Sequence, residues 1–358
     1  MGKNDINQWG KEQIKYAAQR ILKIIDQKQK FTITVFGDFC LDNYLHINPH
    51  LDEISIETNL TAYQVVKIRN TPGAAGSIVN NLRALGIQVN CVGLIGQDGY
   101  GFELKKALHK IGANTHFIVE SDDRYTSTYT KPLREIQPNQ FTELNRQDIR
   151  SRMKITQKQE QELLDQLNKA LQNSAALIIS EQFLTEQESI LTQNMKQELS
   201  NLAKINKERI FYVDSRNSAN QYKHIITKCN QVELFELFDV KLKTHHDYSL
   251  SQLAKYADQL ASITKAPVII TLGEKGTFFK TNEQKALIPA FEVKNKQIDI
   301  VGAGDAFNAG LNMGLTLGLT FGESVLLGNC ISSITIQKLG ETGTASISEI
   351  KKRLHELL

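Results

Sequence analysis

Glycines and carboxylates lie together near the end of the chain, in the stretch IDIVGAGDAFNAG at residues 298–310. Glycines let the backbone turn tightly and let a ligand approach the main-chain amides closely. The first amides of a helix have no internal partner, so Gly302, Ala303 and Gly304 are suited to binding an anion such as a phosphoryl group. Asp305 beside them could take the proton of an attacking hydroxyl as a general base.

The acidic residue of this turn also has a simpler interpretation. Asp is a favoured N-cap, and a helix beginning here needs nothing more from Asp305. Spacing alone does not separate a cap from a catalytic base. The sequence contains no G-x-x-x-x-G-K-[ST] loop, and GAG lacks the third glycine of a dinucleotide-binding turn, so these two phosphate motifs are excluded.

The composition is that of a globular protein, with 41% hydrophobic and 23% charged residues among 358. The 42 Lys and Arg against 39 Asp and Glu give a net charge of +3, so no nucleic acid or anionic membrane is required as a partner. The four cysteines include no C-x-x-C pair. They favour buried free thiols in a reducing compartment over disulfides or a metal site.

The first 30 residues predict an amphipathic helix. They contain neither a membrane span of roughly 20 apolar residues nor a signal peptide core, and Ile6 stands where a myristoylation signal requires Ser or Thr. We expect the helix to lie on the domain, with a membrane-surface helix as the alternative, and the protein to be cytoplasmic. Apolar residues recur at helical spacing at Ile14, Ala17, Ala18, Ile21, Leu22 and Ile25.

From residue 31 onward, apolar runs of strand length alternate with helical stretches and predict an α/β fold. A mostly parallel sheet covered on both faces places ligands at the carboxyl ends of its strands. Residues 45–70 and 117–147 instead alternate polar and apolar, and predict a small sheet standing off the main one over the site. We interpret the Gln- and Lys-rich stretch 154–174 as an exposed, inserted helix. The strand runs are FTITVFGDF, NCVGLIG, AALIIS, RIFYVDS and APVIITLG.

The order of these motifs resembles the PfkB/ribokinase family of carbohydrate kinases. IDIVGAGDAFNAG is similar to the family signature D-[TS]-x-G-A-G-D-x-F, and PGAAGSIVNNLRALG is similar to the N-terminal signature. Further segments match in collinear order over residues 31–358: VFGDFCLDNYL, CVGLIGQDGYG, CNQVE and IITLGEKG. Within the family, GDFCLDNY, LNRQD and KLGETGT look closest to bacterial D-glycero-β-D-manno-heptose 7-phosphate kinases.

The resemblance implies a ribokinase-like three-layer α/β/α kinase domain with a β-sheet lid. It also implies ATP-dependent phosphorylation of a sugar or sugar-phosphate hydroxyl with Mg²⁺, with K⁺ as a further candidate cofactor. Lid sheets of the family often pair between subunits, so a homodimer through the lid is a modest expectation. The heptose kinases often carry a fused nucleotidyltransferase; because this sequence stops soon after the kinase motifs, we expect that activity to be absent.

The resemblance also implies roles for individual residues. Asp305 would be the general base, and the amides of 302–305 the anion hole. The alternative to a binding role for Asp42 is an ordinary turn or cap carboxylate. For Asn230 and Glu233 the alternative is an ordinary exposed helix start. The sugar would contact Asp42, Gly73, Ser77 and Asn81. Glu233 and Asn230 would orient Mg²⁺ through water, and Asp299 would help to hold a monovalent cation. The nucleotide side would be lined by Asn230, Glu233, Thr271, Gly273, Gly276 and Asn329.

Three departures from the family pattern bear on the substrate. Ala74 replaces the second glycine of the N-terminal motif, Ser77 replaces its sugar-contacting Asn, and Ile300 replaces a Thr. A serine hydroxyl reaches less far than an amide, so the sugar preference is open. The alternatives are a kinase for fructose phosphate, ribose or a nucleoside, and a kinase-like protein that binds a sugar without turnover. A sugar phosphate would need cations, for which the candidates are Lys67, Arg69, Lys131, Arg134 and Arg146.

Overall fold

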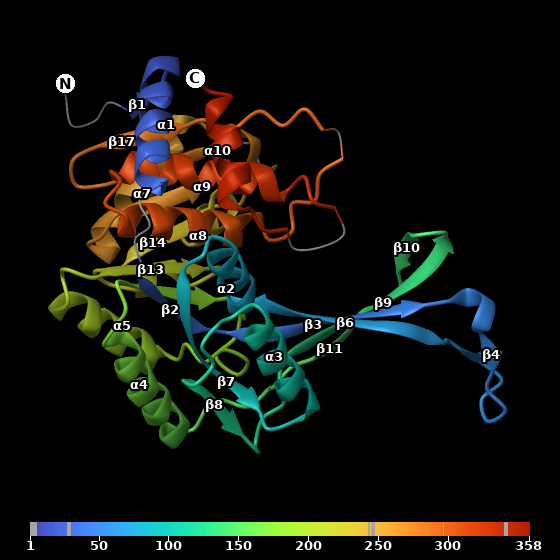
Figure 1. The fold of residues 1–358 in the computed structure, drawn as a ribbon. Helices are drawn as coiled ribbons and strands as arrows, with labels where there is room; N and C mark the ends of the chain where they lie inside the picture. The colour runs from blue at the N-terminus through green and yellow to red at the C-terminus, as the bar shows by residue number, and fades with distance from the viewer. Residues whose placement is uncertain (1–5, 27–29, 243, 245–247, 296, 340–342) are drawn as a thin grey trace.

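A ten-stranded sheet forms the centre of the computed structural model, which describes residues 1–358 except 1–5, 27–29, 243, 245–247, 296 and 340–342 (Figure 1). Neighbouring strands are parallel except where β16 pairs with β15 and β17. The spatial order is β1 (Ile6–Gln8), β17 (Lys285–Ile288), β16 (Thr277–Lys280), β15 (Val268–Thr271), β14 (Ile226–Asn230), β13 (Ile210–Ser215), β12 (Ala176–Glu181), β2 (Thr32–Gly37), β7 (Gln88–Gly96) and β8 (Ile118–Ser121).

Helices cover both faces of this sheet, which confirms the predicted three layers. Ile178 of β12 packs in the core under the first set of helices, whereas Leu177 and Ile179 pack under the second. The strands therefore read as continuous apolar runs, because both faces are buried. The first set is α1 (Lys11–Ile25), α2 (Ala75–Ala84), α3 (Gly99–Lys110), α8 (Ala303–Thr316), α9 (Phe321–Thr335) and α10 (Ile347–His355); the second is α4 (Gln157–Leu171), α5 (Gln193–Ile205), α6 (Gln231–Glu236) and α7 (Leu250–Thr264).

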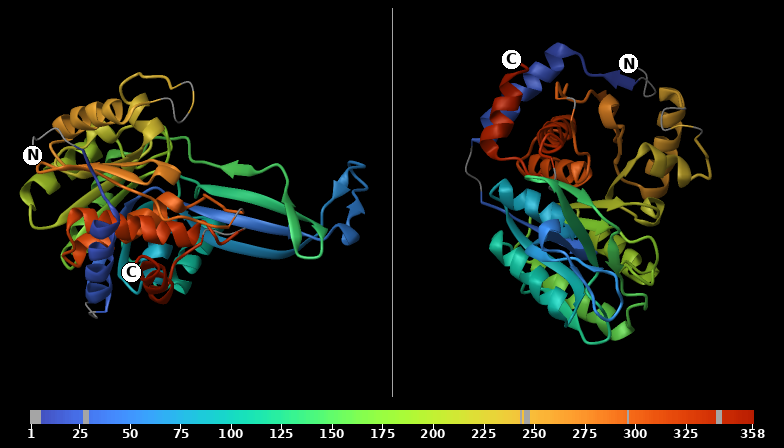
Figure 2. Two further views of the ribbon diagram at one scale, coloured as in Figure 1. Left: turned by 90° about the horizontal axis from the view of Figure 1, so that it is seen from above. Right: turned by 90° about the vertical axis from the view of Figure 1, so that its right-hand side faces the viewer.

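A second sheet forms a long arm that projects from the body (Figures 1 and 2). Its strands run in the order β10 (Gln140–Glu143), β9 (Thr128–Gln137), β3 (Phe39–Ile47) and β6 (Val65–Ala74), with β11 (Gln147–Ile149) also paired to β9. A hairpin of β4 (Glu53–Ile54) and β5 (Thr61–Ala62) follows the short helix η1 (Pro49–Leu51). We call this sheet the lid sheet.

The predicted lid ranges were wrong at two places. Residues 118–121 form β8 and pair in parallel with β7, so they extend the central sheet instead of the lid. Residues 39–44 belong to β3 and therefore to the lid sheet, although their sequence continues the first strand almost without a break. The periodicity could not separate them, because both strands are buried on both faces at this point.

The interpretation of residues 154–174 as an exposed insert was also wrong. Leu163 and Leu167 are fully buried, and α4 packs on β2, β7 and β8 as a regular covering helix. Its Gln and Lys residues mark only the outer face. The N-terminal helix α1 is present as predicted and packs on α9 and α10, and the preceding strand β1 pairs with β17, which the sequence did not predict.

Two smaller expectations concern cysteines and membrane spans. All four cysteines are buried and free. Across the described ranges, no helix combines the length and the hydropathy needed to cross a bilayer.

Candidate functional site

The candidate site lies where the first turn of α8 meets the carboxyl ends of the central strands and the root of the lid sheet. Gly302 has φ of 79° and caps α8, a conformation that glycine adopts without strain. The amide of Ala303 donates to the carbonyl of Ile300 at 3.2 Å. Within the described residues, the backbone amides of Gly302, Gly304 and Asp305 have no hydrogen-bond partner, so these amides are open to an anion.

The carboxyl group of Asp305 lies among other charged groups. Burial raises the pKa of Asp305 to about 7, the carboxylate of Asp214 adds to this, and Lys228 and Arg216 oppose it. Asp42 of the lid sheet raises the pKa further, so the carboxyl groups of Asp42 and Asp305 act on each other electrostatically. A carboxyl group that titrates near neutrality is suited to accepting and releasing a proton.

Lys228 is a residue of this site that the sequence reasoning missed. Its Nζ lies 3.0 Å from both carboxylate oxygens of Asp214, and it would be only 3.3 Å from a Cβ placed on Gly304. Burial lowers the pKa of Lys228, but Asp214 and Glu233 outweigh it and keep the pKa raised, so the side chain is charged. The available signal was a lysine inside the buried strand ITKCN, where a charge needs a partner.

Asp42 lies in the lid strand β3 and not at the end of the first strand, as the sequence had suggested. Its carboxylate is 2.8 Å from Nζ of Lys131, and a Cβ on Gly73 would lie 2.6 Å from it. Glycine at position 73 is therefore required by close approach, and any side chain there would displace Asp42.

The remaining residues predicted for the sugar lie on α2, which packs against α8. Ser77 and Asn81 are both buried, and the side-chain amide of Asn81 donates to the Ser77 carbonyl at 2.9 Å. Oδ1 of Asn81 is buried and has no hydrogen-bond partner among the described residues. Ala74 precedes this helix with φ of 53° and ψ of −122°, a conformation that disfavours any residue with a Cβ. This is the position where the family pattern has glycine.

The residues predicted for the nucleotide gather at the ends of β14 and β15. Asn230 and Thr271 are direct neighbours in register, and the short helix η3 (Gly273–Lys275) links β15 to β16. Gly276 has φ of 95°, and a Cβ there would lie 2.1 Å from the carbonyl of Ile288.

Three of these predicted polar groups already have partners inside the protein. Asn230 and Glu233 form a reciprocal capping box at the start of α6, in which Glu233 accepts from the Asn230 amide at 2.7 Å. Burial raises the pKa of Glu233 to about 7. Asn329 on α9 accepts from the hydroxyl of Thr277 at 2.7 Å and donates to the carbonyl of Pro289 at 3.2 Å. Its amide therefore positions β16 and the chain after β17.

Metal-binding groups are sparse in this region. In the part of the chain that the structure describes, no three His, Cys, Asp or Glu side chains are grouped to hold an ion by themselves. Asp299 accepts from the amide of Val301 at 3.0 Å, and its own amide donates to the carbonyl of Ile336 at 2.8 Å. Mg²⁺ usually keeps several waters and binds through substrate phosphates and one or two carboxylates, a role that Glu233 fits.

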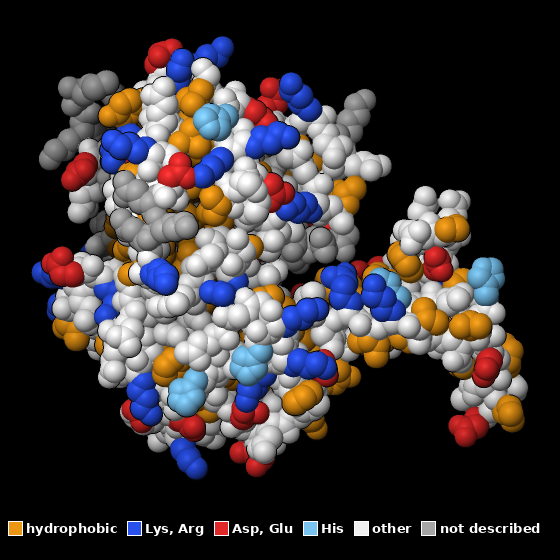
Figure 3. Space-filling view, in the orientation of Figure 1, with side chains coloured by type: hydrophobic (Ala, Val, Ile, Leu, Met, Phe, Trp, Pro, Cys, Tyr) orange, Lys and Arg blue, Asp and Glu red, His pale blue; other side chains and the backbone are white. Residues whose placement is uncertain are grey.

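Cations line the face of the lid sheet that carries Asp42. Tyr44 is in register with Arg69 and Lys131 on the neighbouring strands, and both cations lie over its ring, 3.8 Å and 4.8 Å from the centroid. Lys67 follows in the same row, opposite His46. Figure 3 shows Lys and Arg side chains gathered where the arm leaves the body.

The two other cations predicted for a phosphate are already engaged. Arg134 pairs with Asp52 at 2.5 Å. Arg134 is in register with Ile47, and it therefore lies on the other face of the sheet. Arg146 makes a two-point contact with Asp148 at 2.7 and 2.9 Å. Lys131 is likewise paired, with Asp42, and Arg146 lies over the ring of Tyr129, the register partner of Asp42. The structure therefore separates only Arg134 from the row of Lys67, Arg69 and Lys131.

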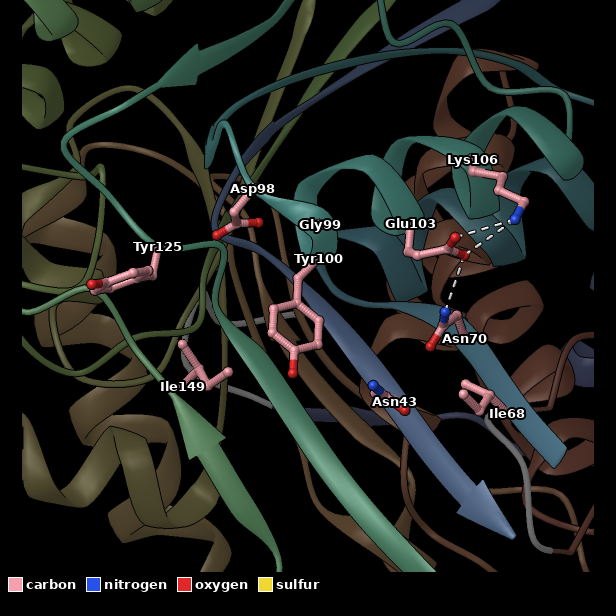
Figure 4. A pocket seen from close by; sticks show the side chains of 10 residues that line it. All are labelled: Asn43, Ile68, Asn70, Asp98, Gly99, Tyr100, Glu103, Lys106, Tyr125 and Ile149. Atoms are coloured by element: carbon pink, nitrogen blue, oxygen red, sulfur yellow. Dashed lines mark hydrogen bonds and ion pairs between the residues drawn. The ribbon is translucent and has the colours of Figure 1, made fainter. Parts of the chain in front are cut away.

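A cavity of about 860 Å³ lies on the opposite face of the lid sheet, against α3 (Figure 4). Asn43 of β3 and Asn70 of β6 are register partners that line it, together with Ile68 and Tyr100. Because successive side chains of a strand point to opposite faces, Asn43 faces away from Asp42 and from the candidate site. The cavity is therefore separate from the candidate site.

Comparison with known proteins gives the family. The model of the pfkB family of carbohydrate kinases matches residues 44–347. Relatives named bifunctional protein HldE from Aliarcobacter butzleri and Sulfurimonas denitrificans are each 28% identical, over 92% and 89% of this chain. The chain spans 66% and 63% of their lengths, less than two thirds of each.

Solved structures share the fold. Phosphofructokinase-2 from Escherichia coli, in complex with fructose-6-phosphate, has a TM-score of 0.68 at 18% identity and covers 92% of this chain and 99% of its own. Ribokinase from Arabidopsis thaliana, complexed with ribose and ATP, has a TM-score of 0.62 at 16% identity with the same coverage. The predicted ribokinase-like fold is confirmed.

Proposed function

This chain belongs to the pfkB family of carbohydrate kinases, and we propose that it transfers the γ-phosphoryl group of ATP to a hydroxyl of a phosphorylated sugar. The observation that carries the proposal is the first turn of α8, where the carboxyl group of Asp305 lies beside two amides without a partner in the described chain. Its pKa of about 7 suits a general base at neutral pH.

Asp305 takes the proton of the acceptor hydroxyl, and the oxygen attacks the γ-phosphorus as its bond to the β–γ bridging oxygen breaks. ADP leaves with the electron pair of that bond. The amides of Gly304 and Asp305 and the ammonium of Lys228 stabilise the charge on the transferred group. Closure of the lid sheet over the sugar would exclude water, which otherwise accepts the phosphoryl group.

ATP is proposed to lie over the ends of β14 and β15, against Asn230, Thr271, Gly273 and Gly276. Glu233 and Asn230 would hold Mg²⁺ through water, where the ion supplies positive charge to the phosphates. Asn329 is proposed to shape this wall without contacting the adenine, because its amide is engaged by Thr277 and Pro289. A K⁺ site beside Asp299 is a further proposal, tested by titrating K⁺ against Na⁺ in the activity assay.

The sugar is proposed to lie between α2 and the lid sheet, with hydroxyls on Asp42 and near Ser77 and Asn81. A carboxylate accepts hydrogen bonds from two hydroxyls, as a polyol requires. The row of Lys131, Arg69 and Lys67 leads away from Asp42 and supports a phosphate at the far end of the sugar. A heptose 7-phosphate phosphorylated at position 1 fits this arrangement and the resemblance of GDFCLDNY, LNRQD and KLGETGT.

A substrate panel tests the proposal. ADP release and ³¹P NMR would be measured with heptose 7-phosphate, fructose 6-phosphate, ribose and nucleosides, at equal enzyme and ATP concentrations. We expect turnover with phosphorylated sugars and the highest kcat/KM with the heptose. If ribose or a nucleoside were turned over with a higher kcat/KM than every phosphorylated sugar, that compound would take the place of the phosphorylated sugar as the proposed substrate. Sugar binding without any phosphoryl transfer would favour the sugar-binding regulatory protein.

The lid sheet also supports a homodimer, which we propose as the assembly. Ile68 is 62% exposed and lies on the face of β6 that lines the cavity, opposite the row of cations. Light scattering of Ile68→Glu should give a monomer at concentrations where the wild type is a dimer. Ile205→Glu, at the exposed end of α5, is the matched control and should leave the assembly unchanged.

A further inference from the structure

Two parallel strands end side by side at the carboxyl edge of the central sheet, and a polar pair lies just beyond them. Glu181 of β12 and Ser215 of β13 are register partners, so the next residues, Gln182 and Arg216, are adjacent. Nε of Arg216 donates to Oε1 of Gln182 at 3.1 Å. The sequence motifs assigned no function to either residue.

The residues of β13 that precede Arg216 contact α8. Tyr212 donates to Oδ1 of Asn308 on α8 at 2.5 Å, and Asp214 accepts from Nδ2 of the same residue at 2.6 Å. Arg216 is the first residue after β13 and the second after Asp214, and it lies in an exposed bend. Its guanidinium is close enough to lower the pKa of both Asp305 and Glu233.

The backbone at Gln182 is fixed by a buried carboxylate. Asp38, at the end of β2, accepts from the amides of Gln182 and Phe183 at 3.0 Å each and from the amide of Ile190 at 3.1 Å. The hydroxyl of Ser189 donates to the same carboxylate at 2.9 Å. Four donors from one connection thus hold Gln182 in place relative to β2.

The backbone before Arg216 is fixed by a second buried carboxylate. Glu181 accepts from the hydroxyl of Ser215 at 2.5 Å and from Tyr222 at 3.0 Å, and also from the hydroxyl of Ser218. Nζ of the buried Lys196 lies 2.6 Å from the other oxygen of Glu181. The turn that carries Arg216 is therefore held in one conformation from both sides.

Carboxyl groups outnumber the ammonium of Lys228 at the candidate site, so a transferring phosphoryl group would need one more cation there. Asp214, Glu233 and Asp305 are three carboxyl groups near one ammonium, and that ammonium, on Lys228, contacts both oxygens of Asp214 at 3.0 Å. In the described ranges, neither Nη atom of Arg216 has a hydrogen-bond or ion-pair partner. Two parallel N–H groups in a fixed plane are suited to two oxygens of a phosphoryl group.

We infer that Arg216 is a further catalytic residue, which donates to the γ-phosphoryl group during its transfer, and that Gln182 is the residue that positions it. The inference rests on the proposed function. Arg216 forms and breaks no covalent bond: the hydroxyl proton still goes to Asp305, and ADP still leaves with the electron pair. The guanidinium contributes positive charge that matters most as charge spreads over the transferring group.

Steady-state kinetics of Arg216→Ala, Arg216→Lys and Gln182→Ala test the inference. Mutation of a transition-state arginine should lower kcat by about 100- to 1,000-fold for Arg216→Ala, with a partial return in Arg216→Lys. Gln182→Ala should lower kcat by about 10-fold with little change in the KM of either substrate, as expected for a group that only orients the guanidinium. Arg209→Ala, at the opposite end of the same strand, is the matched control.

Two further measurements distinguish chemistry from structural damage. Loss of the Arg216 charge should shift the kcat–pH midpoint upward, because that charge lowers the pKa of Asp305. Calorimetric affinity for a non-hydrolysable ATP analogue should fall about 10-fold in Arg216→Ala, while affinity for ADP stays the same, if the contact is to the γ-phosphoryl group.

The outcomes separate this inference from the proposed function. If wild type turns over a sugar and Arg216→Ala keeps kcat within a factor of about three, with an unchanged pH midpoint, the inference is overturned and the kinase proposal stands. Equal losses of affinity for the analogue and for ADP would also overturn it. Wild type without activity on the whole panel would instead remove the proposed function.

Discussion

The first turn of α8 and the lid sheet handle charge in opposite ways. Around Asp305 the polar and ionic groups are packed and paired: Asp214 with Lys228, and Glu233 with the backbone amide of Asn230. The lid sheet carries a row of cations over Tyr44 on one face and exposed apolar side chains on the other. A fixed charge arrangement suits a reaction step that varies little, whereas a row of cations along one face of the lid sheet suits the choice of substrate.

The largest effect is expected from removing Asp305, the proposed general base. Asp305→Asn keeps the shape of the side chain but cannot accept a proton, so kcat should fall by roughly 1,000-fold, within the usual 10²–10⁴ of one acid–base group. Nucleotide affinity should change little. Asp165→Asn on the exposed face of α4 is the control; retention of a tenth of kcat in Asp305→Asn would remove Asp305 from this role.

The next largest effect is expected at Lys228. Lys228→Met should lower kcat by about 100-fold through lost stabilisation of the transferred group. It also leaves Asp214 buried without its counter-ion, which is destabilising by about 3–5 kcal/mol. The double variant Lys228→Met with Asp214→Asn removes both charges and should recover thermal stability but not kcat; recovered activity would assign Lys228 a purely structural role.

The lid is tested by comparing its two faces. Arg69→Ala should raise KM for the sugar phosphate about 10-fold, the value of one charge-assisted contact, and leave KM for ATP unchanged. Arg134→Ala, on the other face, should change neither value. If both variants behave alike, the row of cations does not bind a phosphate.

The pH dependence of activity tests whether burial raises the pKa of Asp305. Activity should rise as pH increases through about 7, because Asp305 must lose its proton to act as the base. The folded-state pKa is raised above the ordinary value of 3.8, so the folded protein binds this proton more tightly and loses stability as pH rises toward 7.

Thermal unfolding tests the raised pKa of Asp305 without any substrate. At pH 8, Asp305→Asn should be more stable than wild type by on the order of 1–2 kcal/mol, after allowance for solvent in the cleft. The difference should disappear as the pH falls below 3.8, where Asp305 is protonated in both the folded and the unfolded protein. A stability gain that did not depend on pH would contradict the shifted pKa.

The smallest effect concerns the strained junction between the lid sheet and α2. Ala74→Gly should stabilise the protein by about 1 kcal/mol, because glycine adopts a φ of 53° without a Cβ clash. Ala84→Gly, in the exposed last residue of the same helix, should destabilise it by up to about 1 kcal/mol. Equal effects of the two changes in chemical denaturation would indicate that Ala74 is unstrained.

Much of the fold followed from local patterns. The apolar runs predicted the central strands, because strands buried on both faces have continuous apolar sequences. The glycine turn before α8 was predictable for a similar reason: Gly302 supplies a left-handed conformation that begins a helix. The boundary between β2 and β3 was not, since burial hides the change of sheet at Gly37.

The site was predicted in part. Gly302, Gly304 and Asp305 formed a recognisable pattern because they lie in one short turn and their proposed function depends on backbone geometry. Lys228 and Arg216 were missed, since a single cation acquires meaning only through the carboxylates that surround it. Arg146 was expected to contact substrate, but Asp148, two residues away, engages its guanidinium.

The sequence by itself determined the alternation of strands and helices and the bare turn at the start of α8, because these depend on the periodicity and conformational freedom of neighbouring residues. The tertiary structure decided which charged and polar side chains meet: Asp42 with Lys131, Lys228 with Asp214, and Arg216 with Gln182. The partners in these pairs are 14 to 89 residues apart (228 − 214 and 131 − 42). Only the folded sheet brings them within a few ångströms, where electrostatic energy becomes large.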